Sequence, residues 1–196
     1  YGGHLSITYE RSGVIRYPWL MRFASVAEDG AQVILGGHYA NELRDRKPDL
    51  FYQLHSVSPD PASALAAGEA LVEQRLLATR GIDPWRGPHA VVILDGANSL
   101  LSGEVSRAAR LSRLGSLLGI SVILCREQRK NAMVSAGDDY IRKVLPGETQ
   151  TGELRLGVMM RGRYAEPEAP NQGSAVYHPF RAEKASFVIG YETQAA

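Results

Sequence analysis

Val91-Val92-Ile93-Leu94-Asp95-Gly96 is the stretch that decides the fold of this chain. Four apolar residues in a row, preceded by Pro88-His89 and followed by small and polar residues, predict a strand buried on both faces of a sheet. In open α/β sheets, ligands bind at the carboxyl ends of the strands, and Asp95 stands at such an end. The stretch therefore predicts an α/β fold with a candidate functional residue at the sheet edge.

Short apolar runs alternate with longer helical patterns on both sides of this strand. The other expected strands comprise residues 5–8, 32–35, 51–57 and 120–125. The expected helices comprise residues 19–27, 61–79 and 103–118, with Pro18 and Pro61 as start signals and Gly119 as a stop signal. Strands that alternate with helices predict a mostly parallel sheet flanked by helices.

The pattern changes after about Glu148, where three further strands follow with little helix between them. They are expected at residues 153–160, 174–177 and 185–191, pairing as antiparallel C-terminal strands at one edge of the sheet. Residues 1–196 are expected to form a single domain, which their number allows.

Composition excludes several classes of function. The net charge of +1 gives no global attraction for nucleic acid, and the single Cys125 excludes an internal disulfide framework. No apolar run approaches the roughly 20 residues that span a bilayer, so no direct membrane contact is expected. Because the chain begins at Tyr1 rather than Met, we expect a piece excised from a larger multi-domain chain.

Five segments, in this order and spacing, resemble the motor domain of the FtsK/SpoIIIE family. The segments are residues 4–8, 32–35, 54–61, 91–101 and 119–129. This family includes DNA translocases, conjugation ATPases and the EccC/EssC ATPases of type VII secretion. The resemblance implies a RecA-like P-loop fold, a Walker B strand at 91–95 and, in intact relatives, a site for ATP and Mg²⁺. It also implies a cytoplasmic domain whose parent chain is anchored in the cytoplasmic membrane.

The residues that would carry nucleotide chemistry depart from the family pattern. A phosphate loop needs several glycines, a lysine and a Ser or Thr. Residues 9–16, Tyr-Glu-Arg-Ser-Gly-Val-Ile-Arg, keep only Ser12, Gly13 and Arg16 as remnants, and Asp95 is the remnant of the metal site. Gly96 replaces the acid that would orient the attacking water. The sequence thus predicts a catalytically degenerate ATPase domain with no catalytic residue, no metal and no cofactor of its own.

A basic cluster follows the strand expected at 120–125 and is the candidate partner-binding site: Arg126, Gln128, Arg129 and Lys130. The expected partners are neighbouring ATPase domains or subunits, a secreted protein peptide, or DNA. Arg107, Arg110 and Arg113 share one helix face and are interpreted as solvated, and the scattered histidines show no zinc-ligand spacing.

Two alternatives remain open at this point. Residues 95–99, Asp-Gly-Ala-Asn-Ser, are similar to the metal-adhesion motif of von Willebrand A-type domains, although Ala97 lacks the expected hydroxyl. The chain could instead be an active ATP-dependent DNA translocase domain with an unorthodox phosphate loop, served by Arg16 or by residues of a neighbouring subunit.

Overall fold

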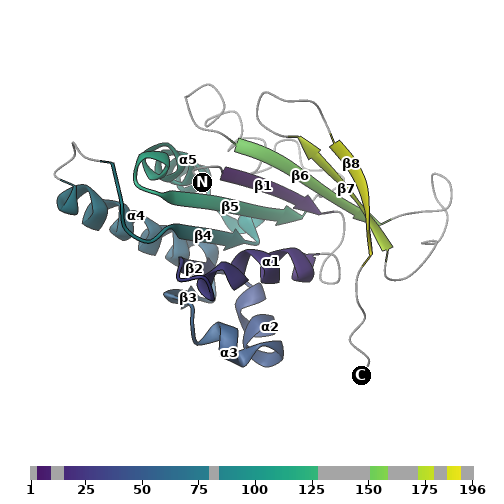
Figure 1. Ribbon diagram of the computed structural model, residues 1–196. Helices are drawn as coiled ribbons and strands as arrows, with labels where there is room; N and C mark the ends of the chain where they lie inside the picture. The colour runs from purple at the N-terminus through teal and green to yellow at the C-terminus, as the bar shows by residue number, and fades with distance from the viewer. Residues whose placement is uncertain are drawn as a thin grey trace.

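The computed structural model describes residues 4–9, 16–79, 84–127, 151–158, 172–178 and 185–190. Its centre is a sheet with the strand order β3-β2-β4-β5-β1-β6-β7-β8 (Figure 1). The strands are β1 His4–Tyr9, β2 Gln32–Gly36, β3 Ser56–Ser58, β4 Ala90–Asp95, β5 Ile120–Glu127, β6 Thr151–Val158, β7 Gln172–His178 and β8 Ala185–Gly190. The helices are α1 Arg16–Ala24, α2 Tyr39–Arg46, α3 Pro48–Phe51, α4 Pro61–Ala78 and α5 Ser102–Leu117, with 3₁₀ turns η1 Ser25–Ala27 and η2 Ala97–Ser99.

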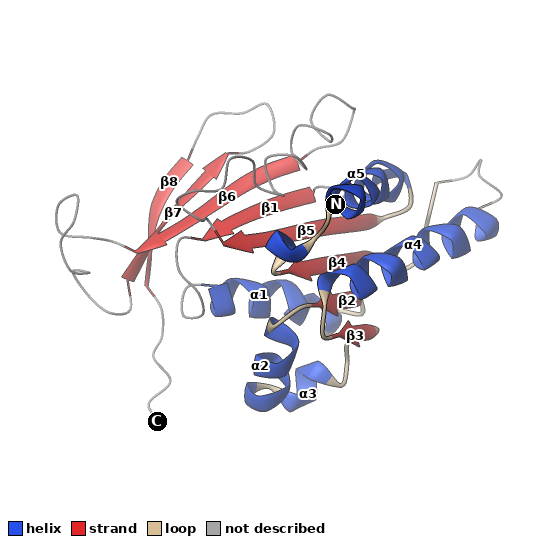
Figure 2. Cartoon of the chain, turned by 180° about the vertical axis from the view of Figure 1, so that it is seen from behind, coloured by secondary structure: helices blue, strands red, loops and turns tan. Residues whose placement is uncertain are grey.

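Helices cover both faces of the parallel strands, as Figure 2 shows from behind. Val92 and Leu94 of β4 pack in one cluster with buried residues of α4 and α5. Val91 and Ile93 point to the other face and pack with Leu20 of α1 and residues of α2. Every residue of β4 is buried because the strand lies inside the sheet and between two helical layers.

The predicted mixed α/β fold with a parallel sheet flanked by helices is confirmed. Local signals placed α4 well: Asp60 caps the helix by accepting the N–H of Ser63, and Pro61 occupies its first position. They also placed the end of α5, because Gly119 adopts the left-handed backbone with φ +66° that ends the helix. Leu76 of α4 is exposed, whereas Leu65 and Val72 of the same helix are buried.

The strand predicted at residues 51–57 is the main error in the parallel half. Pro48-Asp49 begins the short helix α3, which ends at Phe51, and only Ser56–Ser58 pair with β2 as strand β3. Pro at the first helical position and an acid in the first turn are helix-start signals that outweighed the apolar run. The preceding helix α2 was also missed; its Glu42 and Arg46 form an i,i+4 ion pair at 3.5 Å.

The C-terminal strands extend the sheet beyond β1. Strand β6 lies parallel to β1, with His4 opposite Thr151 and Tyr9 opposite Leu156. Strand β7 pairs antiparallel with β6, and β8 pairs antiparallel with β7. The expected antiparallel pairing is therefore wrong for the strand that joins this segment to the sheet, because β6 lies parallel to β1.

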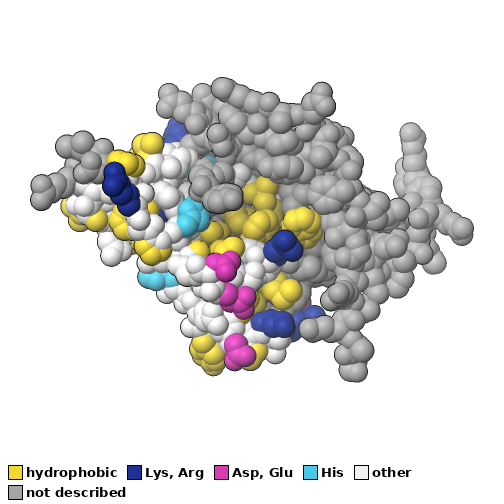
Figure 3. Space-filling model, in the orientation of Figure 1, with side chains coloured by type: hydrophobic (Ala, Val, Ile, Leu, Met, Phe, Trp, Pro, Cys, Tyr) yellow, Lys and Arg dark blue, Asp and Glu magenta, His cyan; other side chains and the backbone are white. Residues whose placement is uncertain are grey.

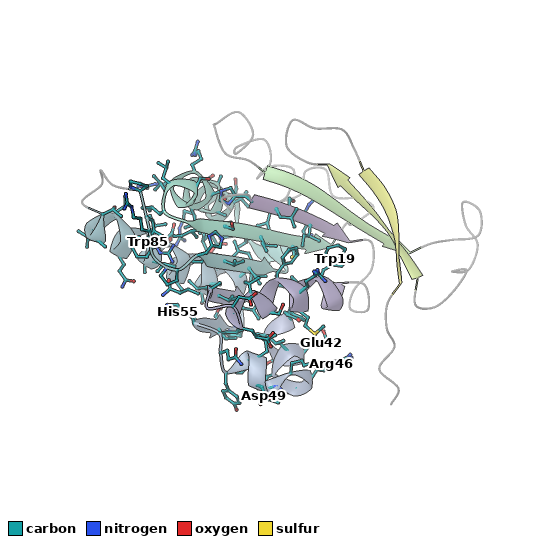
Figure 4. All side chains as sticks on the ribbon, in the orientation of Figure 1. Trp19, Glu42, Arg46, Asp49, His55 and Trp85 are labelled. Atoms are coloured by element: carbon teal, nitrogen blue, oxygen red, sulfur yellow. The ribbon has the colours of Figure 1, made fainter. Side chains whose placement is uncertain are left out.

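Arg75 of α4 connects several segments at the amino-terminal edge of the sheet through hydrogen bonds. Its guanidinium is buried, with 1% of the residue exposed, and donates to the carbonyl oxygens of Leu118, Gly119 and Pro88 at 2.6, 3.1 and 2.9 Å. It also donates to Gln32 Oε1 at 2.6 Å and stacks 4.4 Å from the ring centroid of Trp85. Figure 4 shows Trp85 beside the carboxyl end of α4, far from Trp19 on α1. Burial lowers the pKa of Arg75.

No helix among the described residues is long and apolar enough to cross a membrane.

Candidate functional site

The candidate site lies at the carboxyl edge of the central parallel strands. Asp95 ends β4 and stands opposite Cys125 of β5, while Arg126 of β5 stands opposite Thr8 of β1. Strand β5 thus separates Asp95 from the end of β1, after which residues 10–15 lie outside the described part of the chain. Asp95 and Arg126 share one sheet edge on adjacent strands, as the sequence predicted.

The carboxylate of Asp95 is engaged by a helix. Asp95 is fully buried, and its Oδ2 accepts a hydrogen bond from the backbone N–H of Tyr39 at 2.8 Å. Tyr39 is the first residue of α2, so this N–H is one of those that the helix itself leaves without a partner. The negative charge also lies at the positive end of the helix dipole. Asp95 therefore stabilises the first turn of α2.

Gly37 allows this close approach of α2 to β4. A Cβ on Gly37 would lie 2.0 Å from the carbonyl oxygen of Asp95, and its φ of +123° disfavours any other residue. The N–H of Gly37 donates to the carbonyl of Ser58 on β3 at 3.2 Å, and its carbonyl accepts the N–H of Ala40 at 3.2 Å. The turn after β2 is thus held to β3, β4 and α2 together.

Gly96 directs the chain away from the sheet edge immediately after Asp95. Its backbone is left-handed, with φ 79° and ψ 34°, and leads into η2. Ser99 closes this turn, since both its N–H and its Oγ donate to the carbonyl of Gly96 at 3.0 Å. A Cβ at Gly96 would meet only His38 Cδ2, at 3.7 Å. The position is therefore a glycine for conformational reasons rather than for lack of space.

The other predicted site residues are described only in part. Arg126 is buried, with 5% of the residue exposed. Arg16 begins α1, and only its backbone is described. The other five candidates, Ser12, Gly13, Gln128, Arg129 and Lys130, lie outside the described residues.

Other polar groups have local partners. Arg107 forms a bidentate ion pair with Glu69 of α4, with its Nε 3.0 Å from Oε1, whereas Arg110 and Arg113 are exposed. Cys125 is buried, as predicted. Figure 3 shows acidic and basic side chains interspersed over α2 and α3 on the face in view. Among the described residues, no group of three His, Cys, Asp or Glu side chains could hold a metal ion.

Sequence reasoning missed the two residues that define this site, Tyr39 and Gly37. Gly36-Gly37 directly follows the strand expected at residues 32–35. The pair of glycines after a buried strand was the available signal, because it marks a place where another backbone can approach closely.

Solved structures with the same fold are ATPase domains, and the fold is the RecA-like P-loop fold. The cytoplasmic domain of the Thermomonospora curvata type VII secretion ATPase EccC matches with a TM-score of 0.62 at 12% identity, covering 98% of this chain and 24% of that one. EccC from the same organism (ATPases 2 and 3), in complex with a signal sequence peptide, matches with a TM-score of 0.61 at 10% identity, covering 98% of this chain and 37% of that one. The pCW3 conjugation coupling protein TcpA, in monomer form with ATPgS, matches with a TM-score of 0.58 at 14% identity, covering 96% of this chain and 61% of that one.

This chain thus spans about a quarter of the EccC domain that it resembles. No family model and no curated protein matches it. The RecA-like fold predicted from the FtsK/SpoIIIE resemblance is confirmed, and the matched structures do not support the von Willebrand A-like alternative.

Proposed function

We propose that this chain is a non-hydrolysing ATPase-fold module of a secretion ATPase of the type VII kind, acting through contact with neighbouring domains or subunits. The observation that carries the proposal is the hydrogen bond between the buried carboxylate of Asp95 and the N–H of Tyr39. The fold shared with EccC supports a parent protein of this class. By the same likeness, the module would lie in the cytoplasmic part of a membrane-anchored chain.

Asp95 is poorly suited to hold Mg²⁺. In P-loop NTPases the equivalent Asp helps to hold the metal, which demands near-octahedral oxygen ligands and usually keeps several waters. Here the carboxylate is fully buried, and a metal would have to compete with the N–H of Tyr39 and with the packing of Gly37.

The neighbouring sequence supports the same conclusion. Gly96 supplies no side chain to orient a water, and residues 9–16 contain no lysine and one glycine. Glu10 would also repel a phosphate group. A pocket with these residues would gain little from binding Mg·ATP, since both the charge and the backbone cradle for phosphates are lacking.

Contact with a partner would use the basic cluster that follows β5: Arg126, Gln128, Arg129 and Lys130. One EccC structure was solved with a signal sequence peptide, which makes a peptide of a secreted protein one candidate partner and a neighbouring ATPase domain the other. Because Arg126 is buried, the contact would be made by the later members of the cluster, with Arg126 supporting them from β5.

The first test is phosphate release by the purified chain with Mg·ATP. We expect no release above background, because losing the loop lysine and the catalytic acid removes most of the rate enhancement. Steady turnover that disappears in Asp95→Ala would favour the alternative of an active translocase domain. Calorimetry provides a second readout, and a micromolar Kd, about −8 kcal/mol, would show that a nucleotide pocket survives.

The second test concerns the partner. Arg129→Ala/Lys130→Ala in the parent chain is expected to weaken assembly or transport, while the matched exposed pair Arg110→Ala/Arg113→Ala is expected to leave both unchanged. Binding to duplex DNA is measured across a salt series, because neutralised phosphates produce a steep loss of affinity with salt. If the first pair matches the wild type in every assay, the basic cluster is not the contact surface.

A further inference from the structure

Strand β1 joins two parts of the sheet. Strands β3, β2, β4 and β5 lie on one side of it, and β6, β7 and β8 lie on the other (Figure 1). The register between β1 and β5 begins at Leu5, opposite Ile123, and runs to Tyr9, opposite Glu127. His4, the first residue of β1, precedes this ladder and contacts β5 through its side chain.

The imidazole of His4 takes the place of a backbone acceptor. Its Nδ1 accepts the N–H of Val122 at 3.0 Å, and its Nε2 lies 2.8 Å from Ser116 Oγ on α5. Ser116 Oγ in turn donates to the carbonyl of Ser112 at 3.2 Å. Because Nδ1 accepts, the ring is neutral and carries its proton on Nε2. This one side chain therefore connects the amino end of β1 to both β5 and α5 by hydrogen bonds.

Among the residues that the structure describes, no carboxylate lies beside His4 to favour a charged ring. Only 3% of the residue is exposed. The groups of α5 that face it are Ser112 and Ser116, and from the β4 side His89 adds a repulsive charge when protonated. On β6 it stands opposite Thr151, and the nearest acid there, Glu153, stands opposite Ser6.

Burial is the main cause that lowers the pKa of His4 to about 4; the Ser112 backbone opposes this and His89 adds to it. His89 holds Ser121 Oγ at 3.1 Å, and its own pKa is lowered, first by burial and further by Arg75. The two histidines thus bracket the start of β5, and only His4 links it to β1.

We propose that the hydrogen bond from the N–H of Val122 to His4 is an acid-sensitive link between β5 and β1, and that protonation of His4 separates these two strands. A protonated Nδ1 donates instead of accepting, so it would oppose the N–H of Val122. None of the described residues would supply a counter-ion for the buried cation. Ile7 of β1 and Cys125 of β5 remain packed on the other face of the sheet, so the opening starts at the amino end of β1.

The direction of the effect follows from the two pKa values. An unfolded or opened His4 has the ordinary value of 6.5, and the closed form has about 4. The stability that neutral His4 provides is complete above pH 6.5 and is lost as the pH falls toward about 4. Within this window the equilibrium constant for opening should rise by about tenfold for each unit by which the pH falls.

The test is native-state hydrogen exchange of the Val122 amide in this chain between pH 7 and 4, corrected for the intrinsic rate. In the wild type we expect the corrected opening equilibrium to rise by about tenfold per pH unit. His4→Asn offers an oxygen near the position of Nδ1 but cannot titrate, so its profile should be flat. His89→Gln is the matched control and should keep the wild-type slope.

A flat wild-type profile, or a slope that survives in His4→Asn, would overturn the proposal. Should His4→Asn fail to fold, NMR titration of the imidazole in the wild type decides instead. We expect the Nε2-protonated tautomer and a midpoint near 4. A midpoint at the ordinary value of 6.5 would show that the ring is not held as described.

Discussion

The buried carboxylate of Asp95 accepts a hydrogen bond from the backbone N–H of Tyr39, a residue 56 positions earlier in the chain. The contact joins the end of β4 to the first turn of α2. It gives a structural reason to keep an acid at the end of the central strand even where no metal is bound there.

Removing this acceptor should destabilise the fold. We expect Asp95→Ala to lower the free energy of unfolding by about 2–3 kcal/mol, because the buried N–H of Tyr39 loses a charged partner. Asp95→Asn, which retains an acceptor oxygen, should cost less. The measurement is urea unfolding followed by circular dichroism in EDTA, with the exposed Asp45→Ala as control. Equal stability of Asp95→Ala and wild type would show that the contact contributes nothing.

Gly37 should tolerate no side chain. Gly37→Ala places a methyl group 2.0 Å from the carbonyl oxygen of Asp95 and forces an alanine to a φ of +123°. We expect a loss of about 3 kcal/mol or more in the same unfolding assay, since clash and backbone strain add. Gly103→Ala is the matched control, because nothing lies within 4 Å of its Cβ and it stands in α5. The control should be neutral or slightly stabilising, and a similar loss in both variants would refute the explanation.

Gly96 should accept a side chain at a modest cost. We expect Gly96→Ala to lose about 1 kcal/mol for its left-handed backbone, and Gly96→Asn to lose less, since Asn adopts this conformation more readily. Gly96→Glu restores an acid to this position but should leave phosphate release at background, because the phosphate-loop lysine is still missing. Measurable ATP turnover in Gly96→Glu would mean that the rest of the nucleotide site is functional.

Arg75 should be the most sensitive cation among the described residues. Arg75→Met removes the donors to Leu118, Gly119, Pro88 and Gln32 and the cation over Trp85, so we expect a loss of about 3 kcal/mol or more. Thermal or urea unfolding provides the measurement. Arg113→Met, at an exposed position of α5, should change stability by less than about 0.5 kcal/mol. The idea fails if the two variants lose the same amount.

Local sequence signals determined the elements whose ends depend on nearby residues. Asp60-Pro61 started α4 and Gly119 ended α5, because a cap, a proline and a left-handed glycine act within a few residues of chain. The apolar run before Asp95 likewise determined a buried central strand, and with it the carboxyl edge as the place of the candidate site.

Tertiary structure decided which groups meet at that edge. Nothing near Asp95 in the sequence identifies Tyr39 as its partner, because the contact depends on β2 pairing beside β4 and on Gly37 letting α2 come close. The role of His4 is of the same kind, since its acceptor position matters only when β5 lies beside β1. Capping and turn chemistry act over a few residues and can be read from the sequence alone. The partner of a buried polar group is set by strand order and by the approach of distant backbones, which only the folded chain brings together.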